Sequence, residues 1–377
     1  MPVEEVLSEL VRIPSVARRP NGAIVDYVRG YLGRFGVAST VVAGPEGDRF
    51  NLFATIGPAD RAGYVLSGHL DVVPAEEPTW TSDPFELKRD GERLVGRGSV
   101  DMKGFVACVL ASVPSLVARP LERPIHIALS YDEEAGCIGV RYLISRLPSL
   151  CQPPLGCIVG EPTAMRPVLR HKGKAALRAT VFGRSAHSSQ PDLGVNAIYR
   201  AAEIVAAVRE RTDRLATEGP FSPPFEPPYS TLQVGVIEGG TAVNIVPDRC
   251  VLDIEARAIP GVEPRALLEA LPLGATRPDE ARELPAVEVE WQSDYPALHL
   301  AEDDPLVALT EDVTGRRRAG AVSFGTEAGI YQQAGIPAIV CGPGDIARAH
   351  RPNEFILREE LMQCMGALER LGDRLAA

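Results

Sequence analysis

Histidines and carboxylates recur just after short apolar runs of this sequence, and side chains of these types could hold a divalent cation. His69 and Asp71 stand two residues apart at the end of one such run, so their side chains point to the same face of a strand. An imidazole beside a carboxylate suits a metal ligand whose partner fixes its tautomer. Taken alone, however, such a pair is more often a structural hydrogen bond.

Asp101 lies in the glycine-rich segment G-R-G-S-V-D-M-K-G, just before a run with apolar residues at helical spacing. Glycines allow a close backbone approach, and the helix dipole favours a carboxylate at that position. The segment indicates either a functional carboxylate or a plain helix N-cap. It is not a dinucleotide-binding fingerprint, because the G-x-G-x-x-G spacing is missing.

Further carboxylates and a histidine follow other apolar runs. Asp132, Glu133 and Glu134 are adjacent, and three carboxylates in one compact site require a cation or raised pKa values, although a solvated loop explains them as well. Glu161 ends another run, and His350 follows a Gly-Pro-Gly turn. Each segment is unremarkable alone, but together they occupy the strand ends and loops where α/β folds place their sites.

The elements that must position these residues alternate between strands and helices, which indicates an α/β domain. Apolar runs predict strands at residues 37–42, 51–56, 64–67, 125–129, 157–159 and 337–341. Amphipathic spacing predicts helices at residues 4–11, 23–35, 105–116, 138–147 and 326–334, and from Arg358 onward.

The middle of the chain breaks this rhythm. It predicts, in order, a strand at 174–182, a helix at 195–216, strands at 231–237 and 249–257, a helix at 264–271 and a strand at 287–291. This order is the split βαβ unit of a ferredoxin-like layer. We therefore expect one α/β domain of residues 1–167 and 295–377, interrupted by an inserted α+β domain of residues 168–294.

Composition narrows the classes of function. The 377 residues include 50 acidic and 39 basic side chains, and the net charge of -11 argues against a nucleic-acid partner. Seven scattered cysteines without a C-x-x-C pair predict neither a disulfide framework nor a thiolate metal site. The first residues lack the features of a signal peptide, and the longest apolar stretch is too short to cross a bilayer. We expect a cytoplasmic protein with no membrane partner.

Seven motifs, in one order along the chain, carry a resemblance to a known family. They are S-G-H-L-D-V-V-P, G-R-G-S-V-D-M-K-G, Y-D-E-E-A-G, V-G-E-P-T, G-R-S-A-H-S-S, F-G-T-E-A-G and A-H-R-P-N-E-F. The chain resembles the M20 family of dinuclear zinc amidohydrolases and peptidases, and within it the acetylornithine deacetylases. The resemblance implies a zinc-peptidase-like catalytic domain with a mixed sheet flanked by helices. It also implies that the inserted ferredoxin-like domain serves for dimerisation and as a lid.

The resemblance implies two divalent metal ions per subunit, Zn²⁺ or Co²⁺. Asp101 would bridge them, His69 and Glu161 would complete the ligands of one ion, and Glu134 and His350 those of the other. The residue types agree with this, because imidazole and carboxylate ligands without thiolate suit these metals in open catalytic sites.

The resemblance also assigns catalytic residues. Asp71 orients His69, and Glu133 is the general base for a hydroxide shared by the two ions, later passing a proton to the leaving amine. His187, in the inserted domain, reaches the active site of a partner subunit and binds the oxyanion, which implies a homodimer. Without the resemblance, His187 fits a surface histidine near a turn.

Five residues resemble substrate contacts of the family. Asn244 and Arg257 match contacts to a substrate carboxylate, for which an arginine fork is well suited. Gly325 and Thr326 match contacts to the substrate backbone. Glu327 is a candidate partner for a cationic substrate side chain, and capping of a helix N-terminus explains it as well.

The implied activity is hydrolysis of the amide bond of an N-acyl-L-amino acid, foremost N-acetyl-L-ornithine to L-ornithine and acetate in arginine biosynthesis. N-acetylcitrulline deacetylase, succinyl-diaminopimelate desuccinylase, aminoacylase and small peptidase are the alternative specificities. A non-catalytic metal-binding relative is disfavoured because Glu133 and all five ligands are present. A nucleotide-dependent enzyme is disfavoured because no phosphate-binding glycine loop is present.

Overall fold

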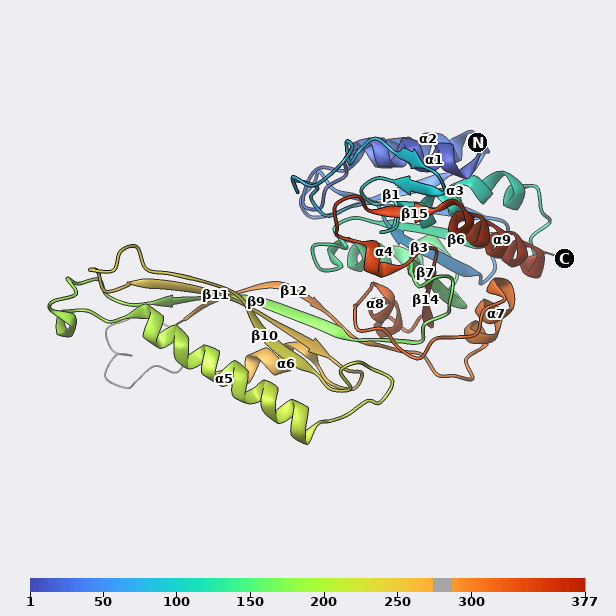
Figure 1. The fold of residues 1–377 in the computed structure, drawn as a ribbon. Helices are drawn as coiled ribbons and strands as arrows, with labels where there is room; N and C mark the ends of the chain where they lie inside the picture. The colour runs from blue at the N-terminus through green and yellow to red at the C-terminus, as the bar shows by residue number, and fades with distance from the viewer. Residues whose placement is uncertain (274–286, 377) are drawn as a thin grey trace. The chain divides into compact units, whose positions relative to one another are not determined.

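The computed structural model describes residues 1–273 and 287–376, and the chain folds into two compact units (Figure 1). Unit 1 comprises Met1–Arg170, Leu298–Ala321 and Thr326–Ala377, and unit 2 comprises His171–Ala297 and Val322–Gly325. Unit 2 thus begins at His171 rather than at residue 168 and ends at Ala297 rather than at residue 294. It also includes a short later segment that no sequence pattern indicated.

Unit 1 is built on a six-stranded mixed sheet. Its strands are β1 (Ser39–Ala43), β2 (Phe50–Ile56), β3 (Tyr64–His69), β6 (Ile125–Ser130), β7 (Gly156–Pro162) and β14 (Ala338–Gly342). They lie in the order β1-β2-β6-β3-β7-β14. The strand β2 pairs antiparallel with β1 and β6, whereas β6, β3, β7 and β14 pair in parallel. Every residue of β6 and β7 is buried, as expected for parallel strands covered on both faces.

Helices cover this sheet, as the expected fold class requires. They are α1 (Val3–Arg12), α2 (Gly22–Gly33), α3 (Lys103–Val117), α4 (Ile138–Leu150), α7 (Pro305–Thr314), α8 (Ala328–Gln333) and α9 (Arg358–Leu375). α3 contacts α1, α2 and α9, while α4 contacts α8. The two groups of helices lie on opposite faces of the sheet, as two adjacent residues of β3 show. Leu66 joins the hydrophobic core that includes α3, whereas the hydroxyl of Ser67 bonds to Tyr331 of α8.

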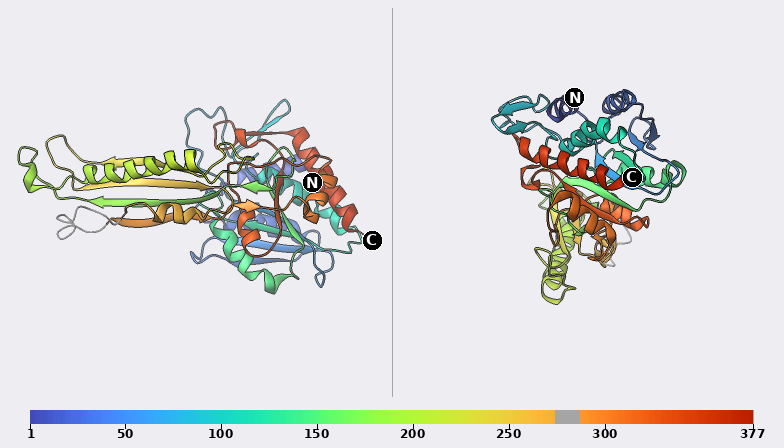
Figure 2. Two further views of the ribbon diagram at one scale, coloured as in Figure 1. Left: turned by 90° about the horizontal axis from the view of Figure 1, so that it is seen from below. Right: turned by 90° about the vertical axis from the view of Figure 1, so that its right-hand side faces the viewer.

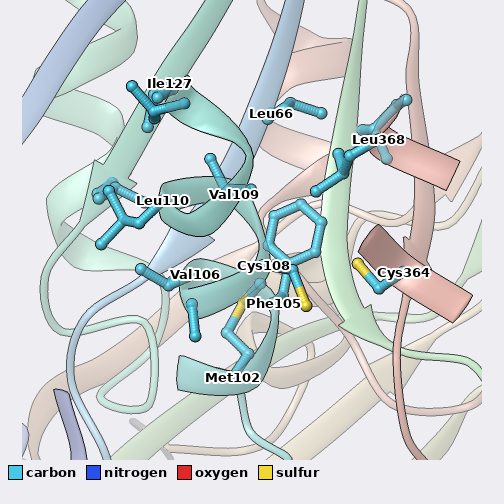
Figure 3. Packing of buried hydrophobic residues seen from close by; sticks show 14 of the residues in the cluster. Leu66, Met102, Phe105, Val106, Cys108, Val109, Leu110, Ile127, Cys364 and Leu368 are labelled. Atoms are coloured by element: carbon cyan, nitrogen blue, oxygen red, sulfur yellow. The ribbon is translucent and has the colours of Figure 1, made fainter. Parts of the chain in front are cut away.

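The helix α3 packs closely on the sheet through Phe105 (Figure 3). A Cβ atom built at Gly160 of β7 would lie 2.1 Å from the Phe105 ring. A Cβ atom at Gly68 of β3 would lie 2.9 Å from the Met102 side chain. Position 160 therefore needs glycine for the close approach of helix and sheet, whereas at Gly68 the flexible end of the Met102 side chain can move aside.

Several short elements outside the inserted sheet were not predicted from the sequence. β4 (Lys88–Asp90), β5 (Arg93–Val95) and β15 (Phe355–Leu357) form a small sheet, and β8 (Arg170–His171) pairs with β13 (Leu298–His299). A 3₁₀ turn, η2 (Ile346–Arg348), follows β14. The small sheet brings the C-terminal part of the chain beside residues that precede α3.

Unit 2 has the predicted order of elements. They are β9 (Gly173–Phe182), the 3₁₀ turn η1 (Pro191–Leu193), α5 (Ala197–Glu218), β10 (Thr231–Gly239), β11 (Arg249–Ala258), α6 (Pro264–Glu269) and β12 (Glu288–Tyr295). The four strands form an antiparallel sheet in the order β10-β11-β9-β12. α5 runs along this sheet (Figure 2), and its apolar face joins a core separate from that of unit 1. The ferredoxin-like topology of the inserted segment is thereby observed.

Two expectations from composition can be compared with the structure. All seven cysteines are free in the structure, and six of them are buried. Within the described residues, every helix is too short or too polar to cross a membrane.

Candidate metal centre and active site

The parallel strands of unit 1 bring the candidate metal ligands to one edge of the sheet, because their carboxyl ends meet there. His69 ends β3, and Glu161 is the sixth residue of β7. Glu134 follows β6, Asp101 directly precedes the first turn of α3, and His350 follows η2. Five distant parts of the sequence therefore meet at one place.

Asp101 lies at the centre of this cluster. Its Oδ1 atom is 3.1 Å from Nε2 of His69, and its Oδ2 atom is 3.2 Å from Nε2 of His350. Glu161 Oε1 lies 3.6 Å from the same His69 nitrogen, and Glu134 Oε1 lies 3.0 Å from the His350 nitrogen. The two oxygens of Asp101 thus face two separate groups of ligand atoms, as a bridging carboxylate would. Met102, not Asp101, occupies the N-cap position of α3, so the plain N-cap interpretation does not hold.

Several buried carboxylates stand close together in this cluster, and burial disfavours their charged forms. Burial raises the pKa of Glu133 to about 8 and that of Glu134 to about 7, and it raises the pKa of Glu161 well above its ordinary value. Burial also acts on Asp101, but hydrogen bonds from His350 and His69 outweigh it and hold the Asp101 pKa well below its usual range. Neighbouring carboxylates of this kind are best satisfied by cations between them.

Asp71 holds its neighbours through hydrogen bonds that the sequence did not predict. The Nδ1–H group of His69 donates to the backbone carbonyl of Asp71 at 2.9 Å, and the Asp71 carboxylate lies farther away, at 3.5 Å. That carboxylate accepts the backbone N–H groups of Glu133 and Glu134, both at 3.1 Å. Asp71 therefore holds the two glutamates, while its backbone leaves Nε2 of His69 available as a ligand atom.

Glu133 lies beside the ligands, where its role remains a prediction. The thiol of buried Cys137 donates to Glu133 Oε1 at 3.3 Å. Ligand atoms of His69, Glu133 and Glu161 lie within 4.8 Å of one another, as do those of His69, Asp101 and Glu134. The carboxylate of Glu133 is thus close enough to the candidate ligands either to bind a cation with them or to exchange a proton with a group bound beside them.

The donor atoms fit the divalent ions that the sequence predicted. They are imidazole nitrogens and carboxylate oxygens without thiolate, which suits Zn²⁺ and Co²⁺. The two oxygens of Asp101 face His69 and His350 separately, so this carboxylate could contact two ions at once. The residues present therefore fit a dinuclear centre.

Glu327 and Thr326 lie in unit 1, and both are buried. Glu327 is 1% exposed, and its carboxylate accepts hydrogen bonds from the hydroxyls of Ser67 (3.3 Å) and Ser130. Burial raises the pKa of Glu327 to about 7. Its side chain makes no cap for α8, whereas the hydroxyl of Thr326 accepts the N–H of Ala328. A contact of Glu327 with substrate stays a prediction.

The other predicted residues belong to unit 2. His187 is exposed, and the backbone N–H of Ser189 donates to its Nδ1 at 3.1 Å, so the neutral ring carries its proton on Nε2. Asn244 is also exposed. Arg257 donates to Glu255 at 3.0 and 3.2 Å and to the Tyr295 hydroxyl at 3.2 Å.

Gly325 also belongs to unit 2, and its position shows why a glycine stands there. A Cβ atom at Gly325 would lie 2.2 Å from the Tyr295 ring. The substrate contacts predicted for Gly325, Asn244 and Arg257 remain predictions, as does the role of His187.

A buried ion pair next to the candidate ligands was not predicted from the sequence. Arg97 and Glu354 are each 1% exposed and form an ion pair at 2.9 Å. Both residues stand inside motifs that carry the family resemblance. However, arginine does not bind metal ions, and Glu354 does not directly follow an apolar run as Glu161 does. The only signal was their opposite charge within those two motifs.

Comparison with known proteins agrees with this fold. Residues 65–374 match the model of peptidase family M20/M25/M40. Acetylornithine deacetylase of Myxococcus xanthus is 34% identical over 378 residues, covering 97% of this chain and 95% of that protein. The crystal structure of an M20 family metallo-carboxypeptidase from Sulfolobus solfataricus superimposes with a TM-score of 0.81 at 18% identity, covering 99% of this chain and 98% of that one.

A second solved structure is described as a dinuclear metal binding peptidase. This M20 family protein of Bacillus subtilis aligns with a TM-score of 0.65 at 13% identity and covers 99% of this chain and 97% of that chain. At such identity the likeness shows the fold alone.

The chain belongs to the M20/M25/M40 peptidase family. Within it, the chain is a metal-dependent amidohydrolase similar to acetylornithine deacetylases.

Proposed function

We propose that the protein hydrolyses the amide bond of N-acetyl-L-ornithine, releasing L-ornithine and acetate for arginine biosynthesis. The observation that carries the chemistry is Asp101, whose two oxygens face His69 and His350 separately. The similarity to acetylornithine deacetylases over nearly the whole chain supports the substrate.

Residues of this chain supply binding, orientation and proton transfer. Asp101, His69, Glu161, Glu134 and His350 would hold two divalent ions, which when bound polarise the amide carbonyl and make a nearby water acidic.

Glu133 would take the proton of the attacking water and deliver it to the leaving amine. A group in this role works best with a pKa near the working pH. Asp71, which holds the backbone of Glu133 at 3.1 Å, keeps the carboxylate aimed at the reacting groups.

We also propose that two copies associate through unit 2, as the family resemblance implies. Most of the exposed large apolar side chains among the described residues belong to this unit, namely Leu193, Tyr199, Phe221, Val236, Ile237, Val243 and Ile245. The strand β10 stands at the edge of its sheet and can pair with another strand. In such a dimer, His187 would serve the active site of the second copy, and its Nε2–H group is the form that donates to an oxyanion.

A panel of substrates tests the proposed specificity. Zinc- and cobalt-loaded protein is assayed on N-acetylornithine, N-acetylcitrulline, N-acetylmethionine and N-succinyl-diaminopimelate. We expect the highest kcat/KM for N-acetylornithine. A higher value for any other member would move the assignment to that sibling activity, and no hydrolysis of any member would contradict the proposed function.

A further inference from the structure

Buried Glu354 joins two segments that carry candidate metal ligands. Its side chain is 1% exposed and lies four residues after His350. Its carboxylate accepts three backbone N–H groups of the segment that ends in Asp101: Gly98 at 3.0 Å, Val100 at 2.9 Å and Asp101 at 3.1 Å. One carboxylate thus collects the backbone donors immediately around the bridging residue.

Arg97 fixes the orientation of that carboxylate. Its guanidinium donates to Glu354 Oε2 at 2.9 Å, to Glu77 at 3.0 Å and to the carbonyl oxygens of Pro74 and Arg351. With Oε2 held by Arg97, Oε1 faces the N–H groups of Val100 and Asp101. Both side chains are buried, so removing the charge of Arg97 leaves the Glu354 carboxylate without its ionic partner, whereas removing that of Glu354 leaves Arg97 with Glu77 alone.

Hydrogen bonds also hold the segment of His350 in position. His350 and Asn353 both have a φ of 57°, a left-handed conformation that non-glycine residues rarely adopt and that surrounding contacts must hold. Asn353 accepts hydrogen bonds from the backbone and hydroxyl of Thr81 at 2.9 and 2.7 Å. Arg97 contributes through its bond to the carbonyl of Arg351.

We propose that Glu354, oriented by Arg97, is the positioning residue that sets the distance between Asp101 and His350 and so assembles the metal centre. This inference rests on the proposed function. Glu354 touches no substrate and no reacting atom, and it acts through the backbone of its neighbours. The charge and the acceptor character of its carboxylate are both needed, because all its partners are donors.

The test is zinc binding by Glu354→Gln. Glutamine keeps the shape but presents an NH₂ group to the backbone donors and removes the negative charge that faces Arg97, which then keeps only Glu77 as an ionic partner. Metal-free wild type and variant are titrated with zinc against a competing chelating dye. We expect zinc affinity to fall about 10–100-fold in the variant, with kcat lowered and KM for N-acetylornithine nearly unchanged. Glu354→Asp, which keeps the charge but is shorter, should recover part of the affinity.

Glu369→Gln is the matched control. Glu369 also pairs with an arginine, Arg119, and accepts a hydroxyl, that of Ser115, but it lies in α9 away from the ligand segments. We expect unchanged zinc affinity for this control.

The outcomes separate the two levels of inference. Equal zinc affinity of Glu354→Gln and wild type, or an equal loss in Glu369→Gln, overturns the role of Glu354. Should Glu354→Gln fail to fold by circular dichroism, Arg97→Lys replaces it, and a several-fold weaker affinity supports the role while an unchanged one overturns it. Failure of the wild type itself to bind two ions would instead contradict the proposed metal centre.

Discussion

The contact between Gly160 and Phe105 predicts a large loss of stability from a single added methyl group. In Gly160→Ala, the new Cβ atom would lie 2.1 Å from the Phe105 ring, whereas carbon atoms in contact prefer about 3.5–4 Å. The ring is 2% exposed and surrounded by core side chains, so it has little room to retreat (Figure 3). We therefore expect Gly160→Ala to lower the free energy of unfolding by about 3 kcal/mol or more, the upper end of the usual cost of overpacking.

A second substitution shows whether the ring is the cause. Phe105→Leu alone removes part of the ring volume and should cost about 1–2 kcal/mol. The double variant Gly160→Ala/Phe105→Leu should be at least about 1 kcal/mol more stable than the sum of the two single effects, because leucine vacates part of the space that the methyl group needs. Gly30→Ala is the control, since Gly30 lies in α2 and a Cβ atom there meets nothing within 4 Å.

The measurement is urea unfolding of the metal-free proteins, followed by circular dichroism. Gly30→Ala should be neutral or slightly stabilising, because alanine favours the helix. Two results would refute the reasoning. One is a Gly160→Ala protein within about 0.5 kcal/mol of wild type, and the other is a double variant whose loss equals the sum of the single losses.

Three further predictions concern catalysis, pH and assembly. Glu133→Gln should keep its zinc while kcat falls about 10²–10⁴-fold, and near-normal turnover would remove Glu133 from its role. Burial lowers the pKa of His126 to about 4. Between pH 6.5, the ordinary pKa of histidine, and pH 4, the unfolded chain therefore binds a proton at this residue and the folded chain does not. The stability that this neutral form provides above pH 6.5 should be lost as the pH falls to 4, by roughly 3 kcal/mol. Urea unfolding should show that His126→Gln loses less free energy of unfolding on acidification than the wild type does. A control variant, His299→Gln, at an exposed position, should lose as much as the wild type. Equal losses in the wild type and both variants would contradict the role of His126. Mixing inactive His187→Ala with inactive Glu133→Gln should restore about a quarter of wild-type activity through mixed dimers, whereas continued inactivity after verified subunit exchange would exclude a shared site.

The gathering of the candidate ligands could be predicted because it follows from local pattern and topology. Apolar runs identified β3, β6, β7 and β14, and parallel strands carry their carboxyl ends to one edge. His69, Asp101, Glu134, Glu161 and His350 each stand at or near such an end or at a helix start, so they meet once the strands pair.

The parts that could not be predicted depend on tertiary contacts or lack an apolar pattern. Arg97 and Glu354 are 257 residues apart, and no local spacing connects them. Strand β4 is exposed throughout and has no apolar alternation to reveal it. The bond from His69 to the backbone of Asp71, rather than to its carboxylate, depends on how the chain turns after β3.

The central claim is that the clustered side chains of unit 1 form a two-ion centre that hydrolyses N-acetylornithine. The most direct measurement is a zinc titration of metal-free protein in which bound ions and released ornithine are counted together. We predict no turnover without metal, and activity that rises with zinc and levels off at two bound ions per chain. Full activity in the presence of excess chelator, or two bound ions without any release of ornithine, would contradict the claim.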